Sequence, residues 1–285
     1  MNQNKSIIAG ILLYNPDLGR LQQNVDAVKK DVDCILFIDN ASSNALEIQE
    51  FAKNNNITLI QNERNEGLPK AFNTMMLYAR DNSFGNLLLL DQDSICESNL
   101  ISVYQDNISS DYVCLVPQII HRLKEYEDKY GQKSTTQKEP ASDIINSGTL
   151  INLNVLPQDI RFNENLFVDC VDFDFFLQLK KRDLKILRIN STSLFCDLGN
   201  LRVHYLFNKP FFSNNYSIFR LEKQAKDRVI FIFSHFKEPL ARKVFFLSIL
   251  GYFTLILFEK RKFSKLIAIF KGICKGIGAL LSGAR

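Results

Sequence analysis

Residues 86–95 read Asn86-Leu87-Leu88-Leu89-Leu90-Asp91-Gln92-Asp93-Ser94-Ile95. The four consecutive leucines predict a strand that is buried on both faces, as in a parallel sheet covered by helices. Two carboxylates follow at Asp91 and Asp93, at the strand end where open α/β sheets bind their ligands. Carboxylates and phosphate oxygens suit hard divalent cations, so the stretch predicts a metal that holds a diphosphate. An Asp-x-Asp tripeptide is also common in solvated turns, so the rest of the chain has to decide.

The segments before this stretch alternate between strand and helix patterns. We expect strands at 7–13, 34–38 and 57–60, and helices at about 18–30, 45–54 and 68–80. Such alternation predicts right-handed crossovers and a largely parallel sheet. The residues that follow the first four strands, Tyr14, Asp39, Asn65 and Asp91, are then expected to share one edge of the sheet.

Beyond Asp93 the pattern is looser. We expect a helix at about 98–106, a strand around 113–116, a mobile polar surface loop over 121–142 and a strand over 144–153. Gly148 lies in that last strand, where a glycine would allow close approach of a ligand. The stretch 167–176 is then expected to be a loop that enters a helix ending near Arg182, with a further strand at 184–189.

Two common nucleotide-binding motifs are absent from the sequence. The first strand-to-helix turn lacks Gly-x-Gly-x-x-Gly, and the chain has no Gly-x-x-x-x-Gly-Lys-Ser/Thr, which argues against a dinucleotide dehydrogenase and a P-loop enzyme. A nucleotide can still bind at the sheet edge, since Asp39 is placed to accept hydrogen bonds from a ribose or base. Asn62, Asn65 and Lys70 would lie near a diphosphate. The alternative, in which Asp39 and Ser42 only shape a turn and cap a helix, stays open.

A second acidic cluster contains Asp169, Asp172 and Asp174. Carboxylates at a helix start can simply cap it and complement its dipole. A partly desolvated carboxylate beside a metal-bound diphosphate can instead take the proton from an acceptor hydroxyl while that hydroxyl attacks an anomeric carbon. Asp172 is our candidate for this base.

Five segments together resemble family 2 glycosyltransferases, in particular their bacterial rhamnosyltransferase-like branch. They follow the family's order and spacing over roughly the first 200 residues: Leu13–Pro16, Ile38–Asn40, Asn62–Asn73, Asp91–Asp93 and Phe167–Asp174. The resemblance implies a GT-A fold, which is α/β and Rossmann-like, with a mostly parallel mixed sheet flanked by helices. It also implies inverting transfer, dependent on Mn²⁺ or Mg²⁺, from a dTDP- or UDP-linked sugar, foremost dTDP-L-rhamnose. The acceptor would be a lipid-linked glycan of a bacterial surface polysaccharide such as O-antigen or capsule.

The resemblance also assigns roles by position. Asp172 would be the catalytic base, and Asp91 and Asp93 would bind the metal and the ribose–diphosphate. Asp197 would be a further metal ligand where this branch usually has a His, with His204 as a looser alternative. The nucleotide-sugar site would comprise Tyr14, Asn15, Asp39, Asn65, Gly67, Lys70, Asn73, Asp91 and Gln92. Residues that support the site or contact the acceptor would be Asp169, Asp174, Gly148 and Arg220.

Composition indicates a globular chain with an uneven charge distribution. The 285 residues are 46% hydrophobic, enough for a sizeable core. From Lys237 onward ten Lys and Arg residues face two acids, whereas the rest of the chain is mildly acidic. Six scattered cysteines without a Cys-x-x-Cys predict neither a disulfide framework nor a zinc knuckle, and a reducing cytosolic setting is the simplest reading. The polar N-terminus and the short apolar run behind it predict no secretory signal.

The tail combines apolar runs with basic residues. Fifteen uncharged, mostly apolar residues run from Val244 to Phe258, between Arg242-Lys243 and Lys260-Arg261-Lys262. Because this run is short for a membrane span, we expect helices that lie in the interface of an anionic cytoplasmic leaflet. A helical hairpin packed on the catalytic body is the alternative. Nucleic acid is not expected, because the basic residues are not interleaved with stacking aromatics.

We therefore predict a GT-A catalytic domain over 1–205, with a nucleotide-sugar half at about 1–95 and an acceptor half at about 96–205. A basic, membrane-associating helical segment would follow over 206–285, making the protein peripheral on the cytoplasmic side of the cell membrane. Alternatives are another hexosyl- or galactofuranosyltransferase with a UDP-sugar, and a non-catalytic membrane-bound glycan-assembly module. A nucleotidyltransferase is disfavoured, because Tyr14-Asn15-Pro16 is not a glycine-rich basic loop. The oligomeric state, a homodimer included, stays open.

Overall fold

The computed structural model describes residues 4–131, 134, 136–141, 145–197, 199, 201–206 and 209–283. Contacts within the chain form two compact units. Unit 1 comprises Met1–Phe162 and Phe175–Asp197, and unit 2 comprises Asn163–Asp174 and Leu198–Arg285. The domain boundary between 205 and 206 stays a prediction. By contacts, the second unit also takes in the acidic segment 163–174.

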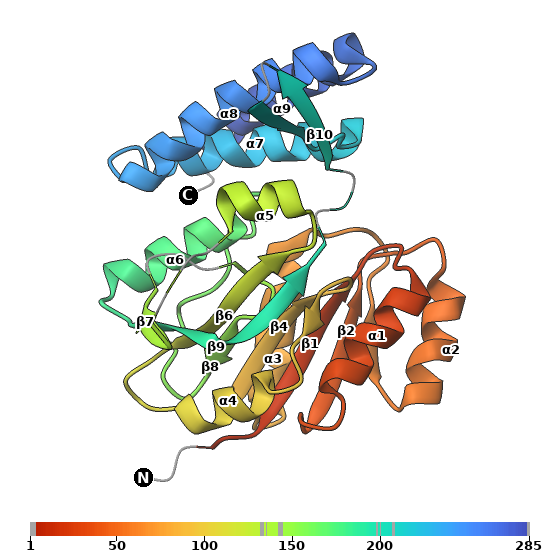
Figure 1. Cartoon of the computed structure of the whole chain (residues 1–285), viewed down its shortest axis with the longest axis vertical. Coiled ribbons are helices and arrows are strands. Elements are labelled where there is room, and N and C mark those ends of the chain that lie inside the picture. The colour runs from red at the N-terminus through yellow and green to blue at the C-terminus, as the bar shows by residue number, and fades with distance from the viewer. Residues whose placement is uncertain are drawn as a thin grey trace. The chain divides into compact units, whose positions relative to one another are not determined.

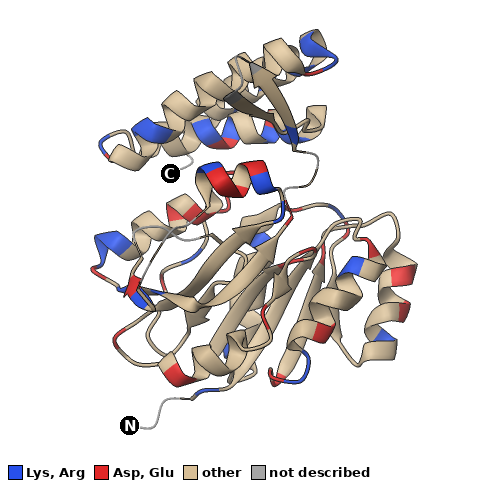
Figure 2. Cartoon of the chain, in the orientation of Figure 1, with Lys and Arg blue, Asp and Glu red and all other residues tan. Residues whose placement is uncertain are grey.

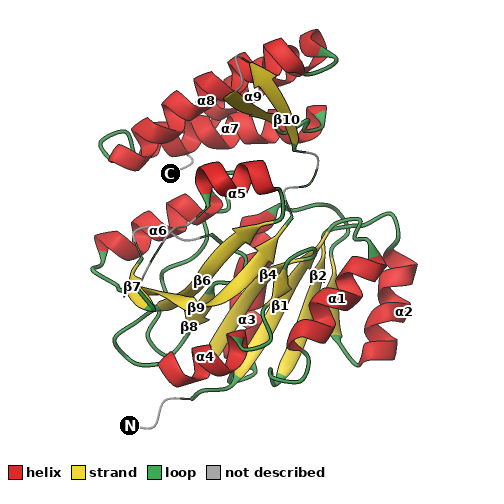
Figure 3. Cartoon of the chain, in the orientation of Figure 1, coloured by secondary structure: helices red, strands yellow, loops and turns green. Residues whose placement is uncertain are grey.

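The first half of unit 1 alternates strands and helices as the sequence predicts (Figures 1 and 3). The elements are β1 (Ile7–Leu13), α1 (Leu18–Val28), β2 (Cys34–Asp39), α2 (Ala45–Asn55), β3 (Thr58–Gln61), α3 (Leu68–Asp81) and β4 (Asn86–Asp91). β1 pairs in parallel with both β2 and β4, and β2 pairs in parallel with β3. The predicted parallel arrangement of these four strands is therefore confirmed.

Local sequence signals fix where these helices begin and end. The carboxylate of Asp17 accepts the backbone N–H of Arg20 at 2.8 Å, so α1 starts behind an N-cap. Pro69 lies in the first turn of α3, where its missing N–H costs no helical hydrogen bond. Asn56 ends α2 in the left-handed conformation. The loops after β1 and β3 are thus each followed by a helix with a defined start.

The second half of unit 1 adds antiparallel pairings. Its elements are β5 (Ile95–Cys96), α4 (Leu100–Asn107), β6 (Cys114–His121), α5 (Lys124–Tyr130), β7 (Lys138–Pro140), β8 (Leu150–Asn152), α6 (Val171–Lys181) and β9 (Ile186–Cys196), and the start of α6, up to Asp174, belongs to unit 2. β8 pairs antiparallel with both β4 and β6. Among the described residues the strand order is β3-β2-β1-β4-β8-β6-β9-β5, with β7 on β9. The sheet is therefore mixed, and its longest pairings are parallel.

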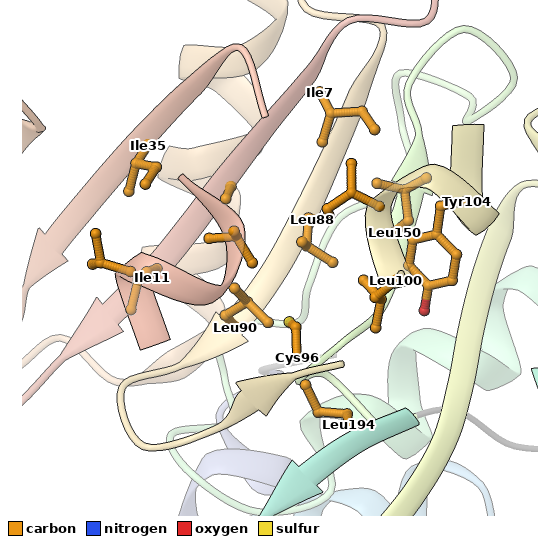
Figure 4. Packing of buried hydrophobic residues seen from close by; sticks show 14 of the residues in the cluster. Ile7, Ile11, Ile35, Leu88, Leu90, Cys96, Leu100, Tyr104, Leu150 and Leu194 are labelled. Carbon is orange, nitrogen blue, oxygen red and sulfur yellow. The ribbon is translucent and has the colours of Figure 1, made fainter. Parts of the chain in front are cut away.

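Helices cover both faces of the central strands. Ile7 and Ile11 of β1 and Leu88 and Leu90 of β4 belong to one buried cluster, to which α1, α2 and α4 also contribute (Figure 4). On the other face α3 passes so close to β1 that a Cβ on Gly10 would lie 2.6 Å from Met75 Sδ. Burial on both faces explains why the central strands are almost purely apolar.

Two expectations for the middle of the chain were wrong. The stretch 121–142 is not one surface loop, because it contains α5 and β7. α5 has no apolar stripe; aromatic contacts hold it, with the Tyr126 ring 4.9 Å from His121 and 4.8 Å from Tyr130. The strand expected over 144–153 is only β8, because residues 145–149 form a turn. Residues 132–133, 135 and 142–144 of these stretches lie outside the described residues.

Unit 2 combines a hairpin with three helices. The elements are β10 (Arg202–Leu206), β11 (Lys209–Ser213), α7 (Ile218–Ser234), α8 (Pro239–Phe258) and α9 (Lys262–Leu281). β10 and β11 pair antiparallel. A Cβ on Gly272 of α9 would lie 2.2 Å from the carbonyl oxygen of Glu222 in α7, and one on Gly276 would lie 2.7 Å from Val229 Cβ. These glycines let the backbones of α7 and α9 approach closely.

The helix α8 is longer than the apolar run within it. It begins at Pro239 and has 20 residues, and it is the described helix long and apolar enough to cross a membrane by length and composition. Residues 239–243, which include Arg242 and Lys243, extend the helix at its N-terminal end beyond the apolar run that the sequence shows. Figure 2 shows α8 as an uncharged stretch with basic residues near both of its ends.

Candidate active site

The carboxyl ends of β1, β2 and β4 lie at the same edge of the sheet. Leu13 pairs with Asp39 and Leu12 with Asp91, so the chain leaves these strands at the same level. Asp39 also pairs with Gln61 at the end of β3, ahead of the loop that contains Asn65. The predicted shared edge is therefore confirmed.

Side chains from α1 and from residue 147 hold the backbone of the acidic turn Asp91–Asp93. Asn24 Nδ2 donates to the carbonyl oxygen of Asp91 at 2.6 Å, and Arg20 Nε donates to that of Asp93 at 2.9 Å. The backbone N–H of Asp91 donates to Ser147 Oγ at 3.0 Å. These bonds are made to main-chain atoms, so the turn is fixed independently of its two carboxylates. Asp91 is exposed and Asp93 half-buried.

Gln92 joins the acidic turn to the loop after β1. Its Oε1 accepts the backbone N–H of Tyr14 at 2.8 Å, and its Nε2 donates to the carbonyl oxygen of Tyr14 at 3.3 Å. Tyr14 itself is exposed. Gln92 thus sets the spacing of two loops, and its predicted contact with a nucleotide stays a prediction.

Asp39 is 1% exposed and closes a turn. Its Oδ1 accepts the backbone N–H of Ser42 at 3.0 Å and the Ser42 hydroxyl at 2.5 Å, and its Oδ2 accepts from Gln61 Nε2 at 3.3 Å. Asn15 reaches the same turn, with Oδ1 accepting the backbone N–H of Ser43 at 2.7 Å. The turn contacts expected for Asp39 are therefore present, and its predicted contact with a ribose or base stays a prediction.

The loop before α3 and the first turns of α3 place four further predicted residues. Asn65 Oδ1 accepts the N–H of Gly67 at 3.0 Å, and Gly67 has a φ of 85°, which favours glycine. Lys70 Nζ lies 3.3 Å from Glu66 Oε2. Asn73 uses its amide on the backbone of Phe162, with Nδ2 donating to the carbonyl oxygen and Oδ1 accepting the N–H, both at 2.9 Å. Asn73 therefore has a structural role in unit 1, whatever it contributes to donor binding.

Three predicted metal ligands lie near one half-buried thiol, that of Cys196. Burial raises the pKa of the Cys196 thiol to about 12, with the charges of Asp91, Asp93 and Asp197 acting in the same direction and the hydrogen bond with Ser94 acting against it. A long β9 produces this arrangement, because the strand expected at 184–189 continues to Cys196 and delivers Asp197 to the same edge. At physiological pH Cys196 is therefore a neutral thiol among carboxylates, and oxygen atoms supply the available anionic ligands.

The same region contains a chain of hydroxyls that the sequence did not suggest. Ser147 Oγ donates to Ser94 Oγ at 2.9 Å, and Ser94 Oγ lies 3.9 Å from Cys196 Sγ. Gly148 follows with a φ of 81°, and a Cβ there would lie 2.9 Å from Pro117. Packing and backbone conformation thus require this glycine, while its predicted role toward a ligand is untested. Within the described ranges, no three His, Cys, Asp or Glu side chains form a ready-made metal site.

The second acidic cluster belongs to unit 2. Asp169 Oδ2 lies 2.5 Å from Arg228 Nε, and Asp174 Oδ1 lies 2.9 Å from His235 Nε2. Asp172, in the first turn of α6, accepts the N–H of Phe173 at 2.9 Å and is half-buried. Of the three acids, Asp169 and Asp174 are bonded to basic side chains of α7 and of the residue that follows it. Asp172 remains our candidate base.

The sequence analysis did not identify the residues in and just after α7 that bind the acidic segment 163–174. These residues are Asp227, Arg228 and His235. One signal was available: Asp227 lies three residues after Gln224 and four before Phe231, both of which belong to the buried face of the helix. A charge on a buried helix face needs a partner, and the partner lies about 60 residues earlier in the chain.

The remaining candidates, His204 and Arg220, have contacts within unit 2. His204 Nε2 lies 2.8 Å from Ser213 Oγ across the β10–β11 hairpin, and its ring stacks on Phe258 at 4.5 Å. The Arg220 guanidinium lies 4.3 Å from the centre of the Tyr216 ring. These contacts give His204 a packing role, and they leave the predicted acceptor role of Arg220 untested.

Residues 9–170 match the family model for glycosyl transferase family 2. The chain belongs to this family. The match begins in β1 and ends just before α6, so it includes the loops after β1 to β4 and the acidic turn, but not Cys196 and Asp197 at the end of β9. The family resemblance predicted from the sequence is therefore confirmed.

A relative found by sequence and two solved structures are similar to this chain. The chain is 28% identical over 190 residues to a dTDP-rhamnosyl transferase, RfbF, of Shigella flexneri; the match covers 61% of this chain and 63% of that protein. A structure of GalNAc-T7 with UDP, GalNAc and Mn²⁺ superposes with a TM-score of 0.57 at 16% identity, covering 81% of this chain and 48% of GalNAc-T7. S. aureus TarS (1–349) gives a TM-score of 0.53 at 17% identity, covering 68% of this chain and 60% of that one. These structures confirm the GT-A fold.

Proposed function

We propose that this family 2 member is an inverting, metal-dependent glycosyltransferase that transfers rhamnose from dTDP-L-rhamnose to a lipid-linked glycan acceptor in bacterial surface polysaccharide synthesis, of the O-antigen or capsule type. The acidic turn Asp91–Asp93, held by its backbone at the carboxyl ends of parallel strands, is the observation that carries the proposal. The relation to a dTDP-rhamnosyl transferase supports the donor, and that relative matches over 63% of its length.

The donor set around Cys196 fits a hard divalent cation. Asp91, Asp93 and Asp197 supply carboxylate oxygens, and the neutral thiol of Cys196 is a poor competitor for Mn²⁺ or Mg²⁺. Two or three carboxylates leave coordination positions for phosphate oxygens of the donor. A metal in this position would offset negative charge on the departing nucleoside diphosphate.

The proposed reaction is a single displacement at the anomeric carbon. The acceptor oxygen forms a bond to that carbon while the bond from the carbon to the diphosphate oxygen breaks. Asp172 takes the proton of the acceptor hydroxyl, and the nucleoside diphosphate leaves with the bonding electron pair. Asp169 and Asp174 keep their basic partners Arg228 and His235 and hold the start of α6.

Two other functions are tested by the same measurement. A hexosyl- or galactofuranosyltransferase would use a UDP-sugar on the same fold; TarS, which shares the fold, has been crystallised with UDP-GlcNAc. A non-catalytic glycan-assembly module would bind without turnover.

The experiment is binding and turnover of a nucleotide-sugar panel, including dTDP-L-rhamnose, UDP-galactofuranose and UDP-GlcNAc, with and without Mn²⁺ or Mg²⁺. We expect selective, metal-dependent binding of dTDP-L-rhamnose, followed by slow release of dTDP. Selective binding of a UDP-sugar would replace the proposed donor. Binding without any release of nucleotide, in the presence of vesicles and acceptor glycolipid, would favour the non-catalytic module.

We further propose that α8 and α9 attach the protein to the cytoplasmic side of the cell membrane as a peripheral protein. α8 buries a narrow stripe that includes Ala241, Val244, Ser248 and Leu255. It exposes eight large apolar side chains: Phe245, Phe246, Leu247, Ile249, Leu250, Phe253, Ile256 and Leu257. α9 adds exposed Phe263, Ile267, Phe270 and Ile277 near Lys271 and Lys275. Apolar faces beside lysines and arginines suit the interface of an anionic bilayer.

The packing of α8 favours an interfacial position over a membrane span. Leu255 of α8 packs with Leu221 and Ala225 of α7, and Arg228 of α7 reaches Ser248 in the middle of α8. α7 also carries Glu222, Lys226 and Asp227. A span through the hydrocarbon core would take these charges with it, at high cost.

Charged residues on the exposed face of α8 should detach the protein from vesicles. Phe246 and Leu250 are 67% and 53% exposed, so Phe246→Glu with Leu250→Glu removes no buried side chain. Each buried apolar side chain contributes about 1.5–3 kcal/mol, so we expect binding to phosphatidylglycerol vesicles to weaken on the order of 100-fold or more. Leu46→Glu, at an 80% exposed leucine of α2, is the matched control and should sediment like the wild type. Equal sedimentation of all three proteins would refute the membrane proposal.

A further inference from the structure

One carboxylate of α7 organises the backbone of the acidic segment 163–174. Asp227 Oδ2 accepts three consecutive backbone N–H groups, from Phe167 at 3.0 Å, Val168 at 2.7 Å and Asp169 at 3.0 Å. Three successive backbone N–H groups can point at one oxygen only if the backbone curves around that oxygen. The three hydrogen bonds therefore fix the path of the chain at these residues. The third of them belongs to Asp169, three residues before Asp172.

The carboxylate that makes these bonds is fully buried. The Asp227 side chain is 0% exposed, and burial raises its pKa to about 6, while the three backbone hydrogen bonds and Lys226 act in the opposite direction. Among the described residues no hydrogen bond reaches its other oxygen, Oδ1, and Lys226 Nζ lies 3.7 Å from that atom. A buried charge with this arrangement costs stability, so its presence calls for a reason other than stability.

Two neighbours of Asp227 bind the side chains of the same segment. Arg228 Nε lies 2.5 Å from Asp169 Oδ2, and His235 Nε2 lies 2.9 Å from Asp174 Oδ1. Asp172 is therefore bracketed by one anchored residue on each side. Arg228 also donates from Nη1 to Ser248 Oγ of α8 at 3.2 Å, so the same residue joins the acidic segment to the helix with the apolar outer face.

We propose that Asp227 and Arg228 are positioning residues for the reaction: by binding the backbone of 167–169 and the side chain of Asp169, they set the direction in which α6 begins and so orient Asp172. The inference rests on the proposed function for its consequence in catalysis, and on the contacts within unit 2 for its geometry. Asp227 acts through the backbone and touches no reacting atom. Its loss should lower the rate of transfer and leave donor binding unchanged.

The test compares Asp227→Asn with the wild type in two readouts. The introduced amide is the same size as the carboxylate and carries no charge, so its oxygen accepts the three N–H groups more weakly. We expect faster hydrogen–deuterium exchange of the peptide that covers 163–174. We also expect kcat to fall on the order of 10- to 100-fold at unchanged KM for the donor, because small displacements of a reacting group have effects of that size. The melting temperature at pH 7 should not fall, because a buried charge is removed.

Two companion variants complete the design. Glu222→Gln is the matched control, since it removes another carboxylate of α7, one that pairs with Lys275 of α9. It should match the wild type in exchange and in kcat. Arg228→Lys keeps the charge beside Asp169 and loses the fork that reaches Ser248, and we expect an intermediate kcat.

The outcomes separate this inference from the proposed function. Unchanged exchange of 163–174 in Asp227→Asn would overturn the inference, and so would equal effects in Glu222→Gln. A fall in melting temperature that accounts for the loss of kcat would also overturn it, because Asp227 would then only stabilise the fold. If the wild type transferred no sugar, the proposed function would fail, and the exchange readout would still decide whether Asp227 orders the segment.

Discussion

Asp172→Asn should leave donor binding intact and reduce transfer on the order of 10²- to 10⁴-fold, the usual contribution of a general base. The amide fits the space of the carboxylate and cannot accept the proton of the acceptor hydroxyl. The substitution changes none of the residues that are proposed to hold the donor and its metal. We expect the loss in kcat, with little change in KM for the donor.

Isothermal titration with the donor and a pH profile of kcat check this prediction. The acid limb of the profile, which reports protonation of the base in the bound enzyme, should be absent in Asp172→Asn. Glu164→Gln, an exposed carboxylate in the same segment, is the control and should retain the wild-type profile. If Asp169→Asn lost the acid limb and Asp172→Asn kept it, Asp169 would be the base. Equal loss of donor affinity in Asp172→Asn and in variants of the acidic turn would refute the assignment of Asp172 as the base and of the acidic turn as the donor site.

Local signals account for the part of the fold that the sequence predicted well. β1, β2, β3 and β4 alternate with helices that have apolar stripes and marked ends, and these features depend only on neighbours in the chain. The strand β4 is a run of leucines between Gly85 and Asp91, which leaves little choice of structure or of burial. The edge shared by Asp39 and Asp91 then follows from parallel pairing alone.

Tertiary contacts decide the parts that were missed. α5 has no buried residue, so its sequence carries no apolar period, and contacts of the Tyr126 ring support it. β9 reaches Cys196 because it pairs with β6 as far as His121, which the composition of 190–196 does not suggest. The partners of Asp227 lie about 60 residues away, so only the three-dimensional contacts identify them.

In the candidate site, too, the sequence predicted some features, and tertiary contacts decided the others. The acids Asp91, Asp93 and Asp197 were predicted, and their common effect on the pKa of Cys196 became visible only with β9 in place. Asp39 and Asn73 have the residue types that bind nucleotides and also the types that close turns. The structure shows the second use, with Asp39 bonded to Ser42 and Asn73 to Phe162. Residue type alone does not separate these uses, because both need an oxygen that accepts backbone or sugar donors.

Asp93→Asn, and separately Asp91→Asn, should abolish the metal-dependent part of donor binding and lower kcat/KM on the order of 10³-fold or more. The reason is electrostatic: each substitution removes a negative hard ligand, and charge stabilisation by a bound metal is worth several kcal/mol in the transition state, about 1.4 kcal/mol per factor of ten. The backbone of the turn should survive, because Asn24, Arg20 and Ser147 bond to main-chain atoms. Donor affinity measured with and without Mn²⁺ checks this, with Asp106→Asn in α4 as an exposed control on the same unit. In the two turn variants the affinity with Mn²⁺ should fall to the value found without it, whereas Asp106→Asn should keep the difference. If Asp91→Asn and Asp93→Asn kept the full response to Mn²⁺, the metal would bind elsewhere, and the acidic turn would act on the donor only through hydrogen bonds.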